Sequence, residues 1–130
     1  MNILVGFNGS NIAVDTLPLV RHRVDVLGAK VFVVTSMRKA NNNQYDKMQQ
    51  AESSLAYAKA FFQANDIPCK THLLIRGLSA GEDLVKFAKE NQIDEILVSI
   101  RRRSKVRKML MGSTAQYVIL NAPCPVVAVK

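Results

Sequence analysis

The chain has 130 residues, a 48% share of hydrophobic residues and a formal net charge of +8. This is the usual size of one domain that can fill a core, so we expect a single domain over residues 1–130. No apolar run reaches the ~18 residues of a membrane span, and the first residues lack the features of a signal peptide. The two cysteines form no CxxC pair, which favours reduced thiols and a cytoplasmic location.

Strand and helix patterns alternate through the first half of the chain. The sequence predicts a strand over residues 2–7, followed by a turn and a helical stripe that ends at Gly28. Pro18 interrupts this stripe, so we expect the helix to be kinked or to start later than Ala13. The pattern then predicts, in order, a strand over residues 30–36, a polar and mobile loop over 37–44, and a helix over about 45–64.

The second half continues the same alternation. Ser79 and Glu82 have the spacing of a capping box, which predicts a helix start. The predicted elements around that helix are a strand over residues 69–76, a strand over 95–100, a helix over about 113–121 and a strand over 126–129. Five strands alternating with four helices favour an α/β domain, with a parallel sheet covered by helices on both faces.

The most unusual feature is the segment from Arg101 to Lys108, in which six of eight residues are cationic. Residues 1–100 carry 11 Lys and Arg against all 10 acids, so nearly all the excess charge lies in the last thirty residues. The segment is interpreted as a loop that leaves a buried strand and enters a helix at Gly112. Such a helix start attracts anions through its free N–H groups and its dipole. An anion site and a solvated basic loop are the two interpretations.

Ligands of open α/β sheets bind beyond the carboxyl ends of the strands, where the strand order reverses. If the first and fourth strands are neighbours, the loop after residue 6 and the loop after residue 100 flank that crevice. Gly112, Ser113 and Thr114 would then supply backbone N–H groups and two hydroxyls to phosphate oxygens. A simple helix-entry turn at Gly112 with an N-cap at Ser113 accounts for the same residues without a ligand.

Residues 112–130, with the sequence GSTAQYVILNAPCPVVAVK, closely resemble the C-terminus of the universal stress protein family. The opening Ile3-Leu4-Val5-Gly6-Phe7-Asn8-Gly9-Ser10 is similar to the first strand and turn of that family, and the resemblance covers the whole chain. It implies a Rossmann-like fold of the adenine-nucleotide alpha hydrolase-like type, a three-layer sandwich around a five-stranded parallel sheet. The implied strand order is 3-2-1-4-5. The resemblance also implies a homodimer through the last strand and, in one branch, ATP binding.

The ATP-binding branch carries the pattern G-x2-G-x9-G-[ST] after the fourth strand. Here Ser99 and Arg102 stand at the first two glycines, the family's first-loop Asp falls on Asn8, and its apolar base-pocket residue falls near Ser36. The cations can instead hold phosphate through charge-assisted hydrogen bonds. The residues expected to bind a ligand are Gly6, Asn8, Ser10, Ser36, Ser99, Arg101, Arg102, Arg103, Gly112, Ser113 and Thr114.

Two classes of function follow. The first is a regulatory stress-response protein, dimeric through strand 126–129, that binds ATP, AMP or another phosphorylated ligand. The second is a member that binds no nucleotide and whose basic loop 101–108 docks on nucleic acid or an acidic partner protein. The loop lacks the aromatic residues on which single-strand binders stack bases, so the first class is favoured.

No enzyme and no metal site are expected, although slow ATP hydrolysis is compatible with ATP binding. The sequence contains no Walker A motif, no nucleophile signature and no metal-ligand spacing. Asp94 and Glu95 precede the fourth strand at its amino end, where we expect them to have a structural role.

Overall fold

A computed structural model describes the backbone of the chain over residues 1–7, 11–39, 45–103, 108–110 and 112–129. Its elements, in chain order, are β1 (Asn2–Gly6), α1 (Asn11–Leu27), β2 (Lys30–Met37), α2 (Tyr45–Ala64), β3 (Cys69–Ile75), α3 (Ala80–Glu90), β4 (Glu95–Ser99), β5 (Arg101–Arg103), β6 (Lys108–Leu110), α4 (Ser113–Asn121) and β7 (Val126–Val129). Five strands form a parallel sheet in the order β3-β2-β1-β4-β7. Because β7 is the fifth strand of this sheet, the predicted order 3-2-1-4-5 is confirmed.

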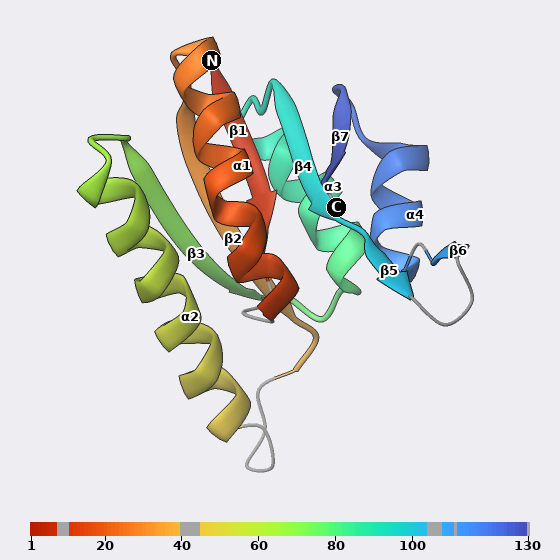
Figure 1. Ribbon diagram of the computed structural model, residues 1–130. Coiled ribbons are helices and arrows are strands. Elements are labelled where there is room, and N and C mark those ends of the chain that lie inside the picture. The colour runs from red at the N-terminus through yellow and green to blue at the C-terminus, as the bar shows by residue number, and fades with distance from the viewer. Residues whose placement is uncertain (8–10, 40–44, 104–107, 111, 130) are drawn as a thin grey trace.

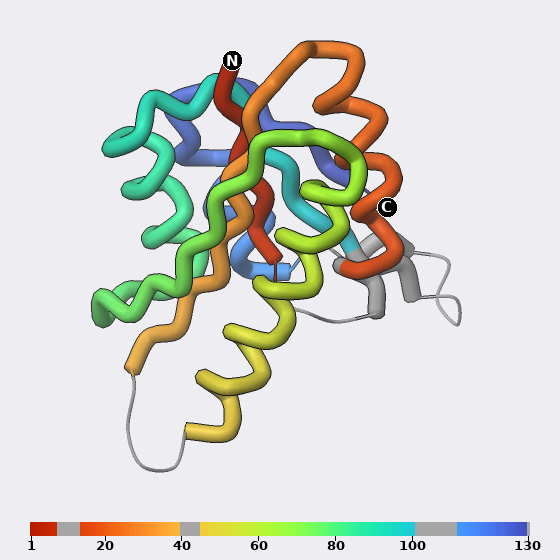
Figure 2. Tube along the Cα trace, turned by 90° about the vertical axis from the view of Figure 1, so that its left-hand side faces the viewer, coloured from red at the N-terminus to blue at the C-terminus, as the bar shows by residue number. Residues whose placement is uncertain are grey.

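The sheet is the middle layer of a three-layer sandwich. Helices α1 and α2 cover one face, and α3 and α4 cover the other (Figure 1). The view in Figure 2, turned by 90°, shows α1 and α3 on opposite sides of the sheet. No helix in the described part of the chain is long and apolar enough to cross a membrane.

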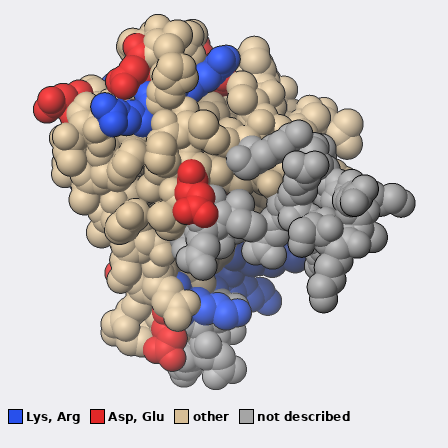
Figure 3. Space-filling model, in the orientation of Figure 1, with Lys and Arg blue, Asp and Glu red and all other residues tan. Residues whose placement is uncertain are grey.

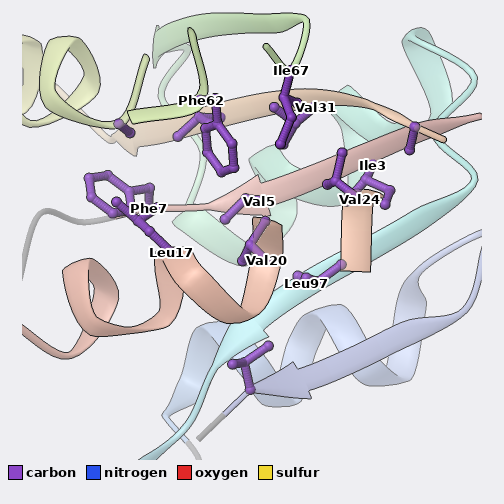
Figure 4. Close-up of a cluster of buried hydrophobic side chains, with 14 of the residues drawn as sticks. Ile3, Val5, Phe7, Leu17, Val20, Val24, Val31, Phe62, Ile67 and Leu97 are labelled. Carbon is purple, nitrogen blue, oxygen red and sulfur yellow. The ribbon is translucent and has the colours of Figure 1, made fainter. Parts of the chain in front are cut away.

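Two separate cores result from the alternation of side chains along the strands. On β1, Ile3 and Val5 face α1 and α2, whereas Leu4 faces α3 and α4. Figure 4 shows the first core, in which Val20 of α1 and Phe62 of α2 pack over β1. The residues of the second core that come from the helices α3 and α4 are Leu84, Val85, Phe87, Ala88, Ala115 and Val118.

Helices α3 and α4 approach each other closely at Gly81. A Cβ atom at this glycine would lie 2.8 Å from the Cβ of Tyr117 on α4, which is too close for a larger residue without a shift of the helices. The start of α3 has the predicted capping box, in which Ser79 and Glu82 satisfy each other's backbone N–H groups. The capping box fixes where α3 begins, and the close approach at Gly81 places α4 directly beside it.

The amino end of the sheet is held by the two carboxylates that precede β4. Asp94 Oδ2 accepts a 2.7 Å hydrogen bond from the backbone N–H of Asn2, and buried Glu95 forms a 2.7 Å ion pair with Arg23 of α1. These contacts give both carboxylates a structural role, as the sequence indicates.

Of the two alternatives expected for α1, the later start is wrong and the kink at Pro18 stays a prediction. The helix begins at Asn11, ahead of Ala13, and continues through Pro18 to Leu27. Pro18 is exposed, whereas its neighbour Leu17 is buried in the first core. Burial of the apolar stripe therefore offsets the backbone hydrogen bond that the proline removes. Gly28 ends the helix at a φ of 61°, a left-handed conformation that suits glycine.

The basic segment also differs from its expected form. Its described residues form an antiparallel pair of short strands rather than a loop, because β5 pairs with β6 in a register that matches Arg101 with Leu110 and Arg103 with Lys108. The pairing satisfies backbone groups that would otherwise need water, and charged residues are typical of short strands outside a main sheet. The mobile loop predicted over 37–44 is only partly testable: Met37 belongs to β2, and residues 40–44 lie outside the described part of the chain.

His72 of β3 packs half-buried between two aromatic rings of the second core. Its ring centroid lies 6.3 Å from that of Phe32 and 5.1 Å from that of Phe87. Burial lowers the pKa of His72 from its ordinary 6.5, and the nearby charge of Lys70 lowers it further. The unfolded chain therefore takes up this proton more readily than the folded protein. The associated stability is complete above about pH 6.5 and is lost as the pH falls towards the folded-state pKa.

We expect the substitution His72→Phe, which keeps a ring between Phe32 and Phe87, to remove this pH-dependent component. Urea denaturation at about pH 7 and about pH 5 should show a smaller loss of unfolding free energy in the variant than in the wild type. His22→Phe, at an exposed position of α1, is the matched control and should keep the wild-type loss. Equal losses in wild type and His72→Phe would contradict this account.

Candidate ligand-binding site

A cavity of about 170 Å³ opens at the carboxyl end of the sheet. From β1 the chain builds outward through β2 and β3, and then returns to the other side of β1 to add β4 and β7. The strand order reverses there, and the crevice at such a point is where α/β sheets bind ligands. The cavity is lined by Gly6, Phe7, Val34, Thr35, Ser36, Ala80, Leu84, Val98, Ser99, Thr114 and Ala115.

Four of the residues predicted from the sequence meet in this cavity. Gly6 ends β1, Ser36 lies near the end of β2, Ser99 ends β4, and Thr114 lies in the first turn of α4. Their separation in the sequence is bridged by the parallel strands, whose carboxyl ends share one edge of the sheet.

Of the other predicted residues, only Gly112 and Ser113 are fully described, and neither lines the cavity. Gly112 and Ser113 precede Thr114 at the start of α4 and are exposed. The backbone of Arg101, Arg102 and Arg103 forms β5, which begins two residues after the cavity residue Ser99. Asn8 and Ser10 lie outside the described residues.

The wall of the cavity consists mainly of apolar residues that the sequence did not single out. Phe7, Val34, Leu84 and Val98 come from β-strand ends and from α3, and all four belong to the buried cores. Gly6 is tightly packed against this wall, because a Cβ atom there would lie 3.0 Å from Leu84 Cδ1. A larger residue at position 6 would therefore displace the Leu84 side chain.

The start of α4 has no side-chain cap among the described residues. Gly112 is the N-cap, with φ −67° and ψ 163°, and Gln116 N–H donates the first helical hydrogen bond to its carbonyl at 3.1 Å. Ser113 is thus the first helical residue rather than the N-cap. The N–H groups of Ser113, Thr114 and Ala115 precede that bond and have no partner within the helix, so they can bind an acceptor from outside it.

The start of α3 differs, although it faces the same cavity through Ala80. Glu82 Oε1 accepts hydrogen bonds from the backbone N–H and the hydroxyl of Ser79, at 3.3 and 2.7 Å. These bonds lower the pKa of Glu82, so its charge persists at neutral pH and lies at the positive end of the helix. An anion is therefore attracted to α4 rather than to α3.

A buried carboxylate lies behind Ser36. Asp83 of α3 is 0% exposed, and its Oδ2 accepts a 2.8 Å hydrogen bond from the hydroxyl of Ser36. Its Oδ1 accepts a 2.6 Å bond from Arg76 Nε, and Arg76 also donates to Glu90 at 2.7 Å. This network was not expected from the sequence. Asp83 lies inside the apolar stripe of its helix, and this position could have indicated the network. A buried carboxylate needs a cation and hydrogen-bond donors nearby.

Both thiols are unsuited to nucleophilic chemistry at neutral pH. Burial raises the pKa of Cys69 to about 11, and burial also raises the pKa of Cys124. Each side chain is half-buried and free of a disulfide bond. Within the described ranges, no three His, Cys, Asp or Glu side chains gather in a way that could hold a metal ion.

Two solved structures match this chain over its whole length. A universal stress protein from Archaeoglobus fulgidus is 30% identical, with a TM-score of 0.89, and the match covers 100% of this chain and 98% of that one. A structure of the universal stress protein from the same organism in complex with dAMP is 27% identical, with a TM-score of 0.81 over 100% and 98% of the two chains.

Curated relatives and a family model give the same assignment. A universal stress protein of Thermus aquaticus is 26% identical over 98% of this chain and 97% of its own length. One from Methanocaldococcus jannaschii is 32% identical, but that match spans 65% of this chain and about half, 49%, of the relative. A match to one from Mycolicibacterium smegmatis likewise spans 55% of that relative. Because the model of the universal stress protein family matches residues 1–130, the chain belongs to this family.

Proposed function

We propose that this protein is a regulatory stress-response protein that binds an adenine nucleotide, AMP or ATP, in the cavity at the carboxyl ends of β1, β2 and β4. The observation that carries the proposal is the meeting of two features at one point. An apolar cavity suited to a base opens beside the uncapped N-terminus of α4, which is suited to a phosphate.

Gly112 supports the phosphate end of this proposal. Its φ of −67° and ψ of 163° are open to any residue, so the backbone does not require glycine there. Packing does not require it either, because no described atom lies within 4 Å of the position of a Cβ. A glycine that neither conformation nor packing explains leaves room for a group from outside the chain to approach the N–H groups of α4.

The size of the cavity indicates how a nucleotide would lie. A volume of about 170 Å³ is below the ~300–1,000 Å³ typical of pockets that enclose a whole drug-sized ligand. We therefore assign the enclosed part to the base, against Phe7, Val34 and Leu84. The sugar and phosphate then extend past Ser99 and Thr114 towards Gly112 and the basic segment.

The A. fulgidus complex with dAMP supports the same ligand class, since that relative matches the full length of this chain. Four positions depart from the ATP-binding branch, namely Asn8, Ser99, Arg102 and Ser36, which falls near an apolar base-pocket residue of that branch. In this proposal the cations of β5 replace the contacts that the missing glycines would have given, because guanidinium groups form strong charge-assisted bonds to phosphate.

We also propose a role in binding rather than catalysis, and a cytoplasmic location. The described lining is made of apolar side chains, glycine, alanine and hydroxyls, which suits recognition of a ligand. The free thiols of Cys69 and Cys124 fit a reducing compartment.

Gly112→Val tests the phosphate end. Calorimetric titration with AMP, ADP and ATP should show binding to the wild type, and the variant should lose at least about tenfold in affinity because its side chain blocks the N–H groups of α4. Far-UV circular dichroism should be unchanged, because valine adopts the Gly112 conformation without strain. The proposal fails if none of the three nucleotides binds the wild type at millimolar concentration.

The role of the basic segment is tested by single charge-removing substitutions at Arg101, Arg102, Arg103, Lys105, Arg107 and Lys108. On the face shown in Figure 3, acidic and basic side chains of the described residues lie together at the top and the bottom. By sequence, this segment holds six of the seven cationic residues that follow residue 100. If the arginines of β5 assist phosphate binding, their removal should weaken ATP binding about tenfold, and the other three should matter less.

The alternative, docking on nucleic acid or an acidic protein, gives a different pattern. All six substitutions would then weaken binding to a mixed-sequence DNA duplex by similar amounts, and raising the salt concentration would abolish the effect. Repeating both titrations at two salt concentrations separates the two roles. Equal, salt-sensitive losses at all six positions would replace the pocket assignment of β5 with the docking role.

We further propose that the protein forms a homodimer through β7. This strand lies at the edge of the sheet, beyond β4. The carbonyl of Pro125 accepts a hydrogen bond from Ile96 N–H, and that of Val129 accepts one from Ile100 N–H. Because backbone groups alternate in direction along a strand, the N–H and C=O groups of Val126 and Ala128 point to the open edge. Exposed Leu120 and Ile119 on the neighbouring α4 add apolar surface beside this edge. An apolar open edge favours pairing with a second copy.

Ala128→Pro should yield a monomer, because proline removes an outward N–H while leaving the bonds to β4 in place. Sedimentation velocity at high micromolar concentration measures the change. Ala128→Ser keeps the N–H and is the matched control that should stay dimeric. A wild-type protein that is monomeric under these conditions would contradict the proposed dimer.

A further inference from the structure

We infer that Ser36 is a specificity-determining residue, whose hydroxyl oxygen accepts a hydrogen bond from an amino group on the ligand's ring and discriminates against a carbonyl oxygen at that place. This inference rests on the proposed function, because it concerns the base end of the same cavity. It adds which ring substituent the cavity selects and which residues of this chain make the selection.

The hydrogen bond between Ser36 and Asp83 has a fixed direction. An ionised carboxylate only accepts hydrogen bonds, so the proton in the 2.8 Å contact with Asp83 Oδ2 is that of the Ser36 hydroxyl. Arg76, whose guanidinium only donates, forms an ion pair with Asp83 and bonds its other oxygen at 2.6 Å. The direction of the bond is therefore fixed from behind the cavity.

Ser36 therefore acts as a hydrogen-bond acceptor towards a ligand. With its proton directed to Asp83, the hydroxyl presents only lone pairs to the cavity that it lines. Thr35 beside it is committed in the same way, because its hydroxyl donates a 2.5 Å hydrogen bond to the carbonyl of Phe7. The β2 end of the cavity therefore carries two hydroxyl oxygens that act as acceptors.

The opposite end has the reverse character. Among the described residues, Ser99 and Thr114 have no hydrogen-bond partner for their hydroxyls, and the free N–H groups of α4 lie beside Thr114. The ends of β2 and β4 are about 10 Å apart, because β1 lies between them at the ~4.8 Å spacing of strands. The cavity thus accepts hydrogen bonds at its β2 end and donates them at its α4 end. This arrangement suits an aminopurine nucleotide with its phosphate at α4.

Three nucleotides with the same sugar and phosphate test the selection. AMP carries a 6-amino group, purine riboside 5′-monophosphate carries hydrogen there, and IMP carries a carbonyl oxygen. We expect AMP to bind the wild type about tenfold more tightly than either analogue. The purine riboside loses one hydrogen bond to Ser36, and IMP sets a carbonyl oxygen against the lone pairs of the Ser36 hydroxyl.

Ser36→Ala should bring the affinities of the three nucleotides close to one another, because it removes the acceptor. Ser36→Thr keeps a hydroxyl and should restore the preference for AMP. Ser53→Ala is the matched control, since Ser53 is exposed on α2 and lines a different hollow of the surface. It should bind all three nucleotides as the wild type does.

Asp83→Asn is the sharper variant because it reverses the hydrogen bond. The amide oxygen must face Arg76, which only donates, so the amide NH₂ faces Ser36 and donates to its oxygen. The Ser36 proton is then released towards the cavity, where it can bind a carbonyl. We expect the ratio of AMP to IMP affinity to fall at least about tenfold and to shift towards IMP.

The outcomes separate this inference from the proposed function. Binding of all three nucleotides with equal affinity by the wild type would overturn the selection by Ser36 and leave the nucleotide site standing. No binding of any of them would overturn the site itself. A Ser36→Ala protein that keeps the full preference for AMP would also overturn the inference, whatever the stability of Asp83→Asn.

Discussion

Burial of the parallel sheet on both faces governs how the helices and the crevice are arranged. Ile3 and Val5 of β1 lie in one core and Leu4 in the other, so helices must cover both sides. The chain meets this need by placing α1 and α2 on one face and then crossing β1 to place α3 and α4 on the other. That crossing opens the crevice at the carboxyl ends of β1 and β4.

Helix α3 connects the core to the crevice. Its apolar stripe packs on the sheet, and the same stripe carries Leu84 to the cavity wall and Asp83 to the back of Ser36. Gly81 lets α4 approach closely enough for Thr114 and Ala115 to close the opposite side. A change in the packing of α3 would therefore alter the shape of the cavity and the orientation of its hydroxyls together.

The Asp83–Arg76 pair shows why a buried charge can persist inside an otherwise apolar helix face. A charge-assisted bond from Arg76 and a hydrogen bond from the Ser36 hydroxyl satisfy the Asp83 carboxylate, and Glu90 holds the far side of Arg76. Such a pair adds little net stability compared with apolar packing, but loss of one partner is costly. Its value here is geometric, because it fixes the direction of a hydrogen bond at the cavity.

The alternation of strands and helices, the capping box at Ser79 and the end of α1 at Gly28 could be predicted from the sequence, because they depend on local periodicity and turn chemistry. The meeting of Gly6, Ser36, Ser99 and Thr114 in one crevice could be predicted too, since parallel strands end at a common edge and the family resemblance supplied the strand order. The sequence did not predict that α1 begins ahead of Ala13 and runs through Pro18, that β5 pairs with β6, or that Asp83 directs the Ser36 hydroxyl. Those three depend on contacts between residues distant in sequence or on pairing of the backbone, which periodicity does not encode.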